Sequence, residues 1–78
     1  MFSKRLRGAR MRIMLTQQQM ADLLSVSLNA YQKYEQGERS PSLDTLVKIA
    51  DILNTSVDYL LGRDEYLRSL GVSVDEFQ

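Results

Sequence analysis

The chain has 78 residues, with 10 basic and 10 acidic side chains, no cysteine and no histidine. This length suits one small domain, and the missing cysteine excludes a disulfide framework and a thiolate metal site. Without histidine, the commonest metal ligand and the usual general base are absent, and no other side chains form a convergent catalytic set. We therefore expect a protein that is not an enzyme and needs no cofactor.

Charge is distributed unevenly along the chain although its sum is zero. Residues 1–13 contain five cations and no acid, whereas residues 64–78 contain one cation and four acids. A basic start and an acidic tail favour a molecule with one face toward nucleic acid. An arginine-rich start without acids is also typical of organellar transit peptides. Because no apolar run has the length of a membrane span and no cleaved signal is apparent, we expect a cytoplasmic protein.

The first predicted helix covers residues 3–13. Four apolar side chains recur at helical spacing and are expected to face the core: Phe2, Leu6, Ala9 and Ile13. Gly8 lowers the stability of this helix by up to about 1 kcal/mol relative to alanine, so we expect close packing at that position. Arg10 lies beside the apolar stripe rather than opposite it.

Residues 16–37 contain two short helical patterns joined by a tight turn. Thr16 is a suitable N-cap, and Gln19 follows at the spacing of a capping box. The first helix is expected over 17–24, with three side chains on its inner face: Met20, Ala21 and Leu24. Ser27 can cap a second helix over 28–36, which Gly37 ends. Two helices of about eight residues with a three-residue turn have helix-turn-helix spacing.

The second helix of this pair has two distinct faces. Tyr31, Tyr34 and Glu35 are expected to point inward. The opposite face is rich in amides: it contains Asn29, Gln32, Lys33 and Gln36, with Leu28 at its N-terminal edge. Amides can bind adenine, lysine can reach guanine, and leucine can touch the thymine methyl group. From the residues alone, this face could equally be an ordinary soluble surface.

The remaining predicted elements complete the core. A loop over 37–41 is bounded by glycine and proline. Ser42 can cap a helix over 43–53, whose core stripe is Leu46, Ile49, Ala50 and Leu53. Ser56 begins a short last helix, in which three side chains are expected to close the core: Val57, Leu60 and Leu61.

An ordered set of motifs occurs at matching spacing: Arg10, Thr16-Gln17, Met20-Ala21, Leu24, Val26-Ser27, Tyr31, Glu35-x-Gly37, Pro41, Leu46-x-x-Ile49-Ala50-x-x-Leu53 and Ser56-Val57-Asp58-Tyr59-Leu60-Leu61. Over residues 3–62 this set resembles the phage repressor and Cro type (XRE-like) of helix-turn-helix DNA-binding domain. The resemblance implies an all-α fold with a compact five-helix domain over 1–62. Residues 63–78 lie beyond the resemblance and are expected to form a short C-terminal extension. It also places the arginine-rich start inside the domain, which argues against a transit peptide.

The resemblance implies roles for individual residues. Arg10 would pair with Glu35 and so join the first helix to the recognition helix. The resemblance also implies that Gln17 contacts a DNA phosphate. Four other residues are expected to contact phosphates as well: Gln18, Ser27, Arg39 and Arg5. The residues of the amide-rich face that are expected to contact bases are Leu28, Asn29, Gln32 and Lys33. The chain departs from the family where glycine is frequent, with Met14 before the second helix and Ser25 in the turn. A left-handed backbone at Ser25 would cost about 1–2 kcal/mol.

The function implied is that of a sequence-specific regulator of transcription that binds double-stranded DNA, with a repressor expected. Members of the family usually bind inverted repeats as homodimers, on half-sites about 34–36 Å apart. Dimerisation is expected through the last helix or through the extension, whose apolar residues are Tyr66, Leu67, Leu70, Val72, Val74 and Phe77. An antitoxin or adaptor, in which the extension binds a small partner protein and DNA binding is secondary, is the alternative.

Overall fold

The computed structural model of this chain describes residues 2–62, which form five helices and no strand. The helices are α1 (Phe2–Arg12), α2 (Gln17–Leu24), α3 (Leu28–Gln36), α4 (Leu43–Ile52) and α5 (Val57–Leu60). The predicted all-α fold is confirmed, and the predicted boundaries agree to within one residue for the first four helices. The predictions for the C-terminal extension lie outside the described residues.

Short polar side chains define where four of the helices begin. Each N-cap has an extended backbone, and its side-chain oxygen accepts the backbone N–H three residues later: Thr16 from Gln19, Ser27 from Ala30, Ser42 from Thr45 and Ser56 from Tyr59. Thr16 and Gln19 form the full capping box predicted from their spacing. A local side chain therefore marks and satisfies each of these four helix starts.

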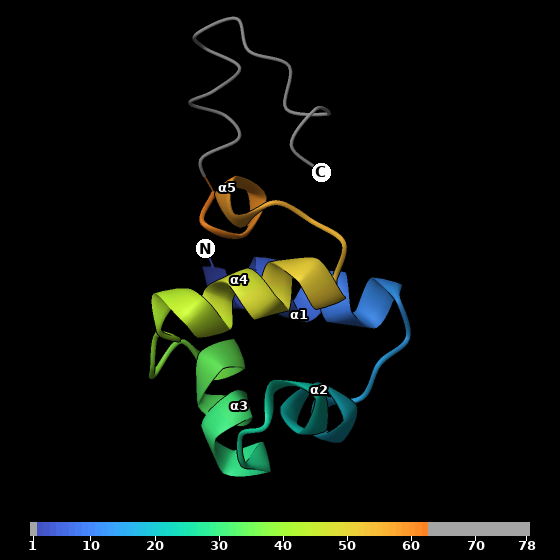
Figure 1. Cartoon of the computed structure of the whole chain (residues 1–78), viewed down its shortest axis with the longest axis vertical. Coiled ribbons are helices and arrows are strands. Elements are labelled where there is room, and N and C mark those ends of the chain that lie inside the picture. The colour runs from blue at the N-terminus through green and yellow to red at the C-terminus, as the bar shows by residue number, and fades with distance from the viewer. Residues whose placement is uncertain (1, 63–78) are drawn as a thin grey trace, which may run out of the picture.

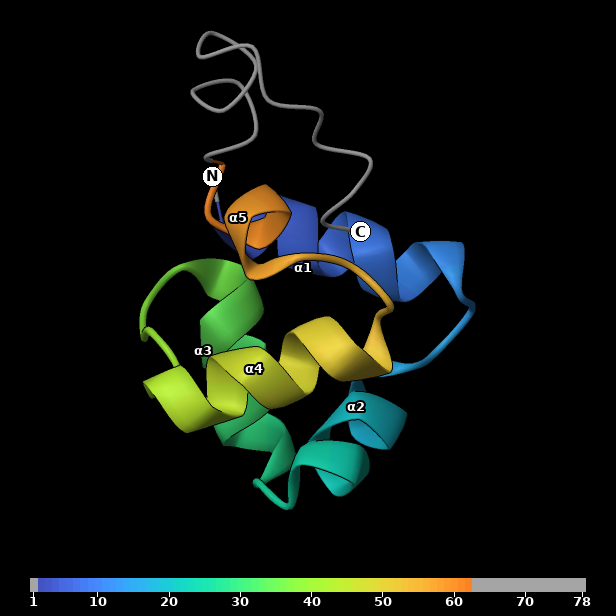
Figure 2. The same ribbon diagram turned by 45° about the horizontal axis from the view of Figure 1, so that its top comes forward.

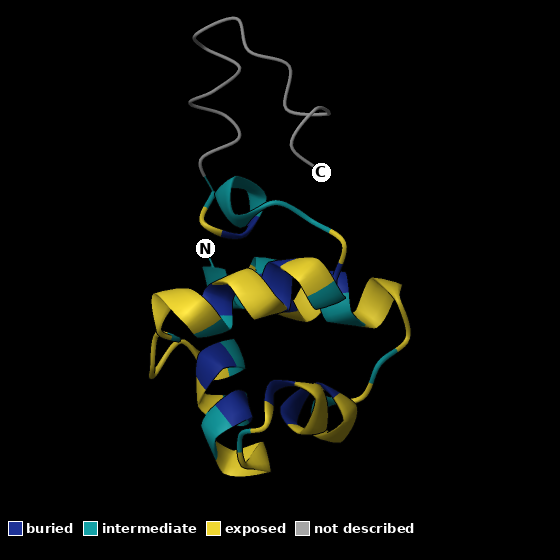
Figure 3. Ribbon diagram, in the orientation of Figure 1, coloured by how far each residue is buried: buried dark blue, intermediate teal, exposed yellow. Residues whose placement is uncertain are grey.

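The helices surround one small core. In Figure 1, α4 lies in front of α1, and α2 and α3 lie at the end of the domain away from α5. Figure 2 shows α5 lying against α1. Buried residues occupy the sides of α2, α3 and α4 that face the interior (Figure 3). The largest fully buried side chains come from all five helices: Leu6, Met20, Tyr31, Ile49 and Leu60. Packing against α1 and α2 therefore holds α3 in place.

Three packing predictions are wrong. Ile13 is 42% exposed and Leu61 is 45% exposed, because each lies just beyond the last residue of its helix. The helical spacing that would have carried both side chains to the core no longer holds there. Gly8 is not closely packed, since no atom outside its own helical surroundings lies within 4 Å of the position that a Cβ atom would occupy. Leu6, Ala9, Leu53 and Leu60 are buried as predicted.

Within residues 2–62, three residues other than glycine adopt a left-handed backbone: Met14 (φ 62°), Ser25 (φ 57°) and Asn54 (φ 52°). Each follows the end of a helix, where this conformation closes the last turn. The backbone expected at Ser25 is thus present. Met14 has the greatest conformational cost among them, because asparagine and, less often, other short polar residues adopt this region more readily than a long side chain.

Replacing Met14 by glycine is expected to raise the free energy of unfolding by about 0.5–1 kcal/mol. The Met14 side chain is 87% exposed, so its removal loses few packing contacts. Urea denaturation measures the change, and Asn54→Gly is the matched control, expected to gain less because asparagine tolerates this backbone. A Met14→Gly protein less stable than the parent would contradict the argument from backbone strain.

Candidate nucleic-acid interface

The turn between α2 and α3 consists of Ser25, Val26 and Ser27. The N–H of Ser25 donates to the Asp22 carbonyl at 3.1 Å, and the N–H of Val26 donates to the Ala21 carbonyl at 3.0 Å. These two bonds satisfy carbonyls at the end of α2. Ser27 then begins α3 with its own cap. The two helices are therefore joined by a turn with a defined backbone.

The exposed face of α3 carries the predicted base-contacting residues. Leu28, Asn29 and Lys33 are exposed, and Gln36 is exposed at the end of the same face. Tyr31 and Tyr34 are buried on the opposite side. Gln32 differs from its neighbours because it is half-buried and its amide is turned toward α2. The structure thus places three of the four predicted base contacts on open surface and the fourth at its edge.

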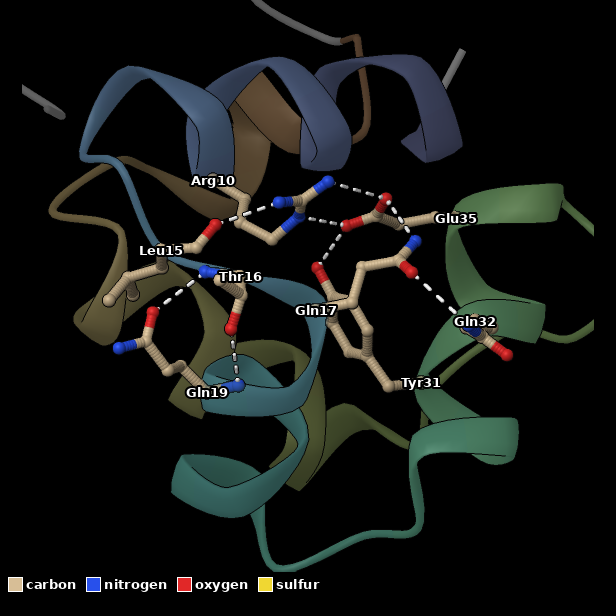
Figure 4. A network of polar contacts seen from close by, with 8 residues as sticks. All are labelled: Arg10, Leu15, Thr16, Gln17, Gln19, Tyr31, Gln32 and Glu35. Carbon is tan, nitrogen blue, oxygen red and sulfur yellow. Dashed lines mark hydrogen bonds and ion pairs between the residues drawn. The ribbon is translucent and has the colours of Figure 1, made fainter.

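The structure brings Arg10 and Glu35 together. The Arg10 Nε lies 2.6 Å from Glu35 Oε2, and Nη2 donates to Oε1 at 3.2 Å. The two side chains are only 11% and 3% exposed, respectively. The remaining Nη1 donates to the Leu15 carbonyl at 2.7 Å. This bidentate pair links α1 to α3 (Figure 4).

Two further side chains complete the surroundings of the Glu35 carboxylate. The Tyr31 hydroxyl donates to Oε2, and the Gln17 Nε2 donates to Oε1 at 3.1 Å. The Gln17 Oε1 in turn accepts from Gln32 Nε2 at 3.2 Å. Among residues 2–62, no buried side-chain nitrogen or oxygen lacks a hydrogen-bond partner. Sequence reasoning missed the Tyr31 contact, although its position one turn before Glu35 on the inward face is a usable signal.

These contacts shift the ionisation of all three titratable groups. Burial alone would raise the pKa of Glu35, but hydrogen bonds from Arg10, Tyr31 and Gln17 and the charge of Arg10 lower it overall. Burial and the neighbouring carboxylate raise the pKa of Tyr31 well above its usual value. The hydrogen bond to Glu35 raises the pKa of Arg10. The cluster therefore favours ionised Glu35, ionised Arg10 and neutral Tyr31.

The free energy of unfolding is expected to fall at both extremes of pH. The lowered pKa of Glu35 contributes stability above about pH 4.5, which is lost as the pH falls through the folded-state value. The raised pKa of Tyr31 contributes stability below about pH 10, which is lost as the pH rises further. Denaturation midpoints measured across pH test this. Glu35→Gln should flatten the acid limb and Tyr31→Phe the alkaline limb, and unchanged limbs would contradict the assignment.

The arginines of α1 point to two different sides of the helix. Arg5 and Arg12, seven residues apart, face α5. The Arg5 guanidinium lies 4.6 Å from the centre of the Tyr59 ring and donates to the Tyr59 carbonyl at 3.0 Å. The Arg12 guanidinium lies 6.0 Å from the centre of the same ring. Arg7, by contrast, is exposed on the side of Arg10. The structure therefore places Arg5 in a contact with α5, away from the exposed face of α3.

An open groove of about 720 Å³ runs between α1, the start of α2 and α3. Its lining includes Arg7, Gln17, Gln18 and Leu28. Gln18 is exposed and donates to Asp22 at 2.9 Å. Two other predicted phosphate contacts lie outside this groove lining: Ser27 at the start of α3, and Arg39, which is exposed in the loop after α3. Most of the predicted contacts with DNA thus surround α3 on the exposed side of the domain.

Within residues 2–62, no cluster of acidic side chains is arranged to hold a metal ion. No helix in this range is long and apolar enough to cross a membrane.

A short first helix, a defined turn and a second helix with an exposed polar face together define a helix-turn-helix domain. The family model described as Helix-turn-helix matches residues 6–60, and the chain belongs to this family. No solved structure shows a significant match to the chain.

Several curated relatives cover most of the chain. It is 52% identical over 60 residues to the cryptic phage CTXphi transcriptional repressor RstR of Vibrio cholerae serotype O1, an alignment that covers 77% of this chain and 54% of the relative. It is 44% identical to the HTH-type transcriptional regulator ImmR of Bacillus subtilis, with 80% and 49% covered. The HTH-type transcriptional activator BcrR of Enterococcus faecalis is 33% identical, with 85% and 32% covered. The chain spans about half the length of RstR and ImmR.

Proposed function

We propose that this protein regulates transcription by binding a specific double-stranded DNA sequence, and that it represses by occluding a promoter. The observation that carries this proposal is the exposed face of α3, whose side chains project from a helix held by a buried ion pair. In a helix-turn-helix domain, this second helix enters the major groove. The similarity to RstR, named as a transcriptional repressor, supports repression rather than activation.

The proposed contacts divide into those with bases and those with phosphates. Leu28, Asn29, Gln32 and Lys33 would contact base edges. Gln17, Gln18, Ser27 and Arg39 would contact phosphates. The Ser27 oxygen accepts the Ala30 N–H, so its hydroxyl hydrogen is available to a phosphate. Because Arg5 is engaged with Tyr59, we assign its expected phosphate contact to Arg7, which lines the groove beside Gln17.

The proposed DNA-binding form is a homodimer on an inverted repeat. One domain of this size can contact only a few base pairs. A two-fold symmetric dimer contacts twice as many. Half-site centres would be about 10 base pairs apart, so that two copies of α3 enter successive turns of the same groove. Dimerisation is assigned to α5 or to the segment after residue 62.

Selection from a random duplex library, repeated at low and near-physiological salt, tests this function. The expected result is an inverted repeat with the predicted half-site spacing at both salt concentrations. Binding without a consensus, lost by about 200 mM salt, would show contacts with phosphates only. That result would overturn the proposal and favour a function centred on a protein partner.

A further inference from the structure

The Glu35 carboxylate determines how the Gln17 amide is oriented. An ionised carboxylate only accepts hydrogen bonds, so the end of the Gln17 side chain that meets it must be the NH₂ group. The structure has this arrangement, with Gln17 Nε2 donating to Glu35 Oε1 at 3.1 Å. The Gln17 carbonyl oxygen is consequently turned away from Glu35, toward α3 (Figure 4).

The Gln17 amide in turn determines the orientation of Gln32. Because Gln17 presents an oxygen, Gln32 must present its NH₂ group, and its Nε2 donates to Gln17 Oε1 at 3.2 Å. In Figure 4 the Gln32 carbonyl oxygen lies on the side of its amide away from Gln17. The buried carboxylate thus fixes the orientation of the Gln17 amide, and the Gln17 amide fixes that of Gln32, at the edge of the exposed face of α3.

The orientation of a glutamine amide matters for base recognition. In the major groove, adenine and cytosine present amino groups, which donate, whereas guanine O6 and N7 and thymine O4 accept. A free glutamine can rotate its amide to suit either kind of base. Rotation of Gln32 would lose its bond to Gln17 and oppose two carbonyl oxygens, which is unfavourable.

We propose that Gln17 is a positioning residue that holds Gln32 with its carbonyl oxygen toward DNA, so that Gln32 prefers adenine or cytosine over guanine or thymine at one base position. This inference rests on the proposed function, because it requires that α3 read bases. It goes beyond that function in two respects. It assigns the class of base that Gln32 prefers, and it identifies the Glu35 carboxylate, acting through Gln17, as the group that determines this preference.

Base-preference profiles of purified variants test the inference. Gln32→Met first identifies the position that Gln32 reads, as the one whose preference disappears. At that position, the wild-type preference for an amino base is expected to be about five- to tenfold, the effect of one hydrogen bond. Gln17→Met should reduce it to less than about twofold and leave the other positions unchanged. The matched control is Gln18→Met, whose amide bonds Asp22 outside this network. As the loss of a proposed phosphate contact, it is expected to lower affinity evenly for all sequences and to leave the preference at the Gln32 position unchanged.

The outcomes separate this inference from the proposed function. A wild-type preference for guanine or thymine at the Gln32 position, or an unchanged profile in Gln17→Met, would overturn the inference alone. An even loss of affinity in Gln17→Met with no change of base preference at the Gln32 position would do the same, because it indicates that Gln17 acts through a phosphate contact only. Absence of any consensus in the wild-type protein would overturn both.

A measurement without DNA tests the same hydrogen bond. In nuclear magnetic resonance spectra of the free protein, the side-chain NH₂ signal of Gln32 should shift in Gln17→Met and stay in place in Gln18→Met. An identical Gln32 signal in all three proteins would overturn the inference. Thermal unfolding of each variant confirms that the compared proteins are folded.

Discussion

Replacing Glu35 by alanine is expected to lower the free energy of unfolding by about 3–5 kcal/mol, the cost of removing one partner from a buried ion pair. The Arg10 side chain, only 11% exposed, would keep its charge without the carboxylate. Tyr31 and Gln17 would lose their acceptor at the same time. Urea or guanidinium denaturation measures the change.

Two variants separate the buried pair from ordinary surface charge. Glu38→Ala removes an exposed carboxylate just after α3, and its effect should stay within about 0.5 kcal/mol. The double variant Arg10→Met with Glu35→Leu should recover much of the loss, because no charge is left buried. A loss below about 1 kcal/mol in Glu35→Ala would mean that the pair behaves as a solvent-exposed salt bridge.

Replacing Asn29 by alanine is expected to weaken binding to the selected operator by about 1–3 kcal/mol and to relax the preference at one or two positions. Asn29 is exposed in the first turn of α3, where the side chains nearest the base edges are found. Fluorescence anisotropy with the operator and with single-base variants of it measures both the affinity and the preference.

Arg39→Ala provides the contrast for this prediction. Arg39 is exposed in the loop after α3 and is proposed to contact a phosphate, so its loss should weaken binding to every sequence equally. It should also reduce the slope of log affinity against log salt by about one. If Asn29→Ala and Arg39→Ala produced the same sequence-independent loss, the assignment of base contacts to α3 would be wrong.

Much of this fold could be predicted because its signals are local. Thr16, Ser27, Ser42 and Ser56 each cap the helix that follows, and a cap depends on only three or four neighbouring residues. The errors at Ile13 and Leu61 have a local cause as well. The apolar periodicity continues through Ile13 and Leu61, but the helices end one residue earlier. The pattern alone therefore predicts a buried helix face that is one residue too long in each case.

The candidate site could be predicted only in part. The faces of α3 follow from helical geometry, and the resemblance to a family supplied the pairing of Arg10 with Glu35. Counting charge at the start of the chain could not show that Arg5 stacks on Tyr59 while Arg7 lines the groove. The bond between Gln17 and Gln32 joins different helices, and its detection required the packed structure.

The buried cluster around Glu35 has a consequence for the thermodynamics of recognition. Arg10 and Gln17 anchor α3 to α1 and to α2 before any DNA is present. Association then orders few additional backbone dihedrals, so the conformational entropy lost on binding is small compared with that of a segment that folds on its target. The heat-capacity change of binding should accordingly reflect the contact area itself, with little contribution from coupled folding of the reading helix.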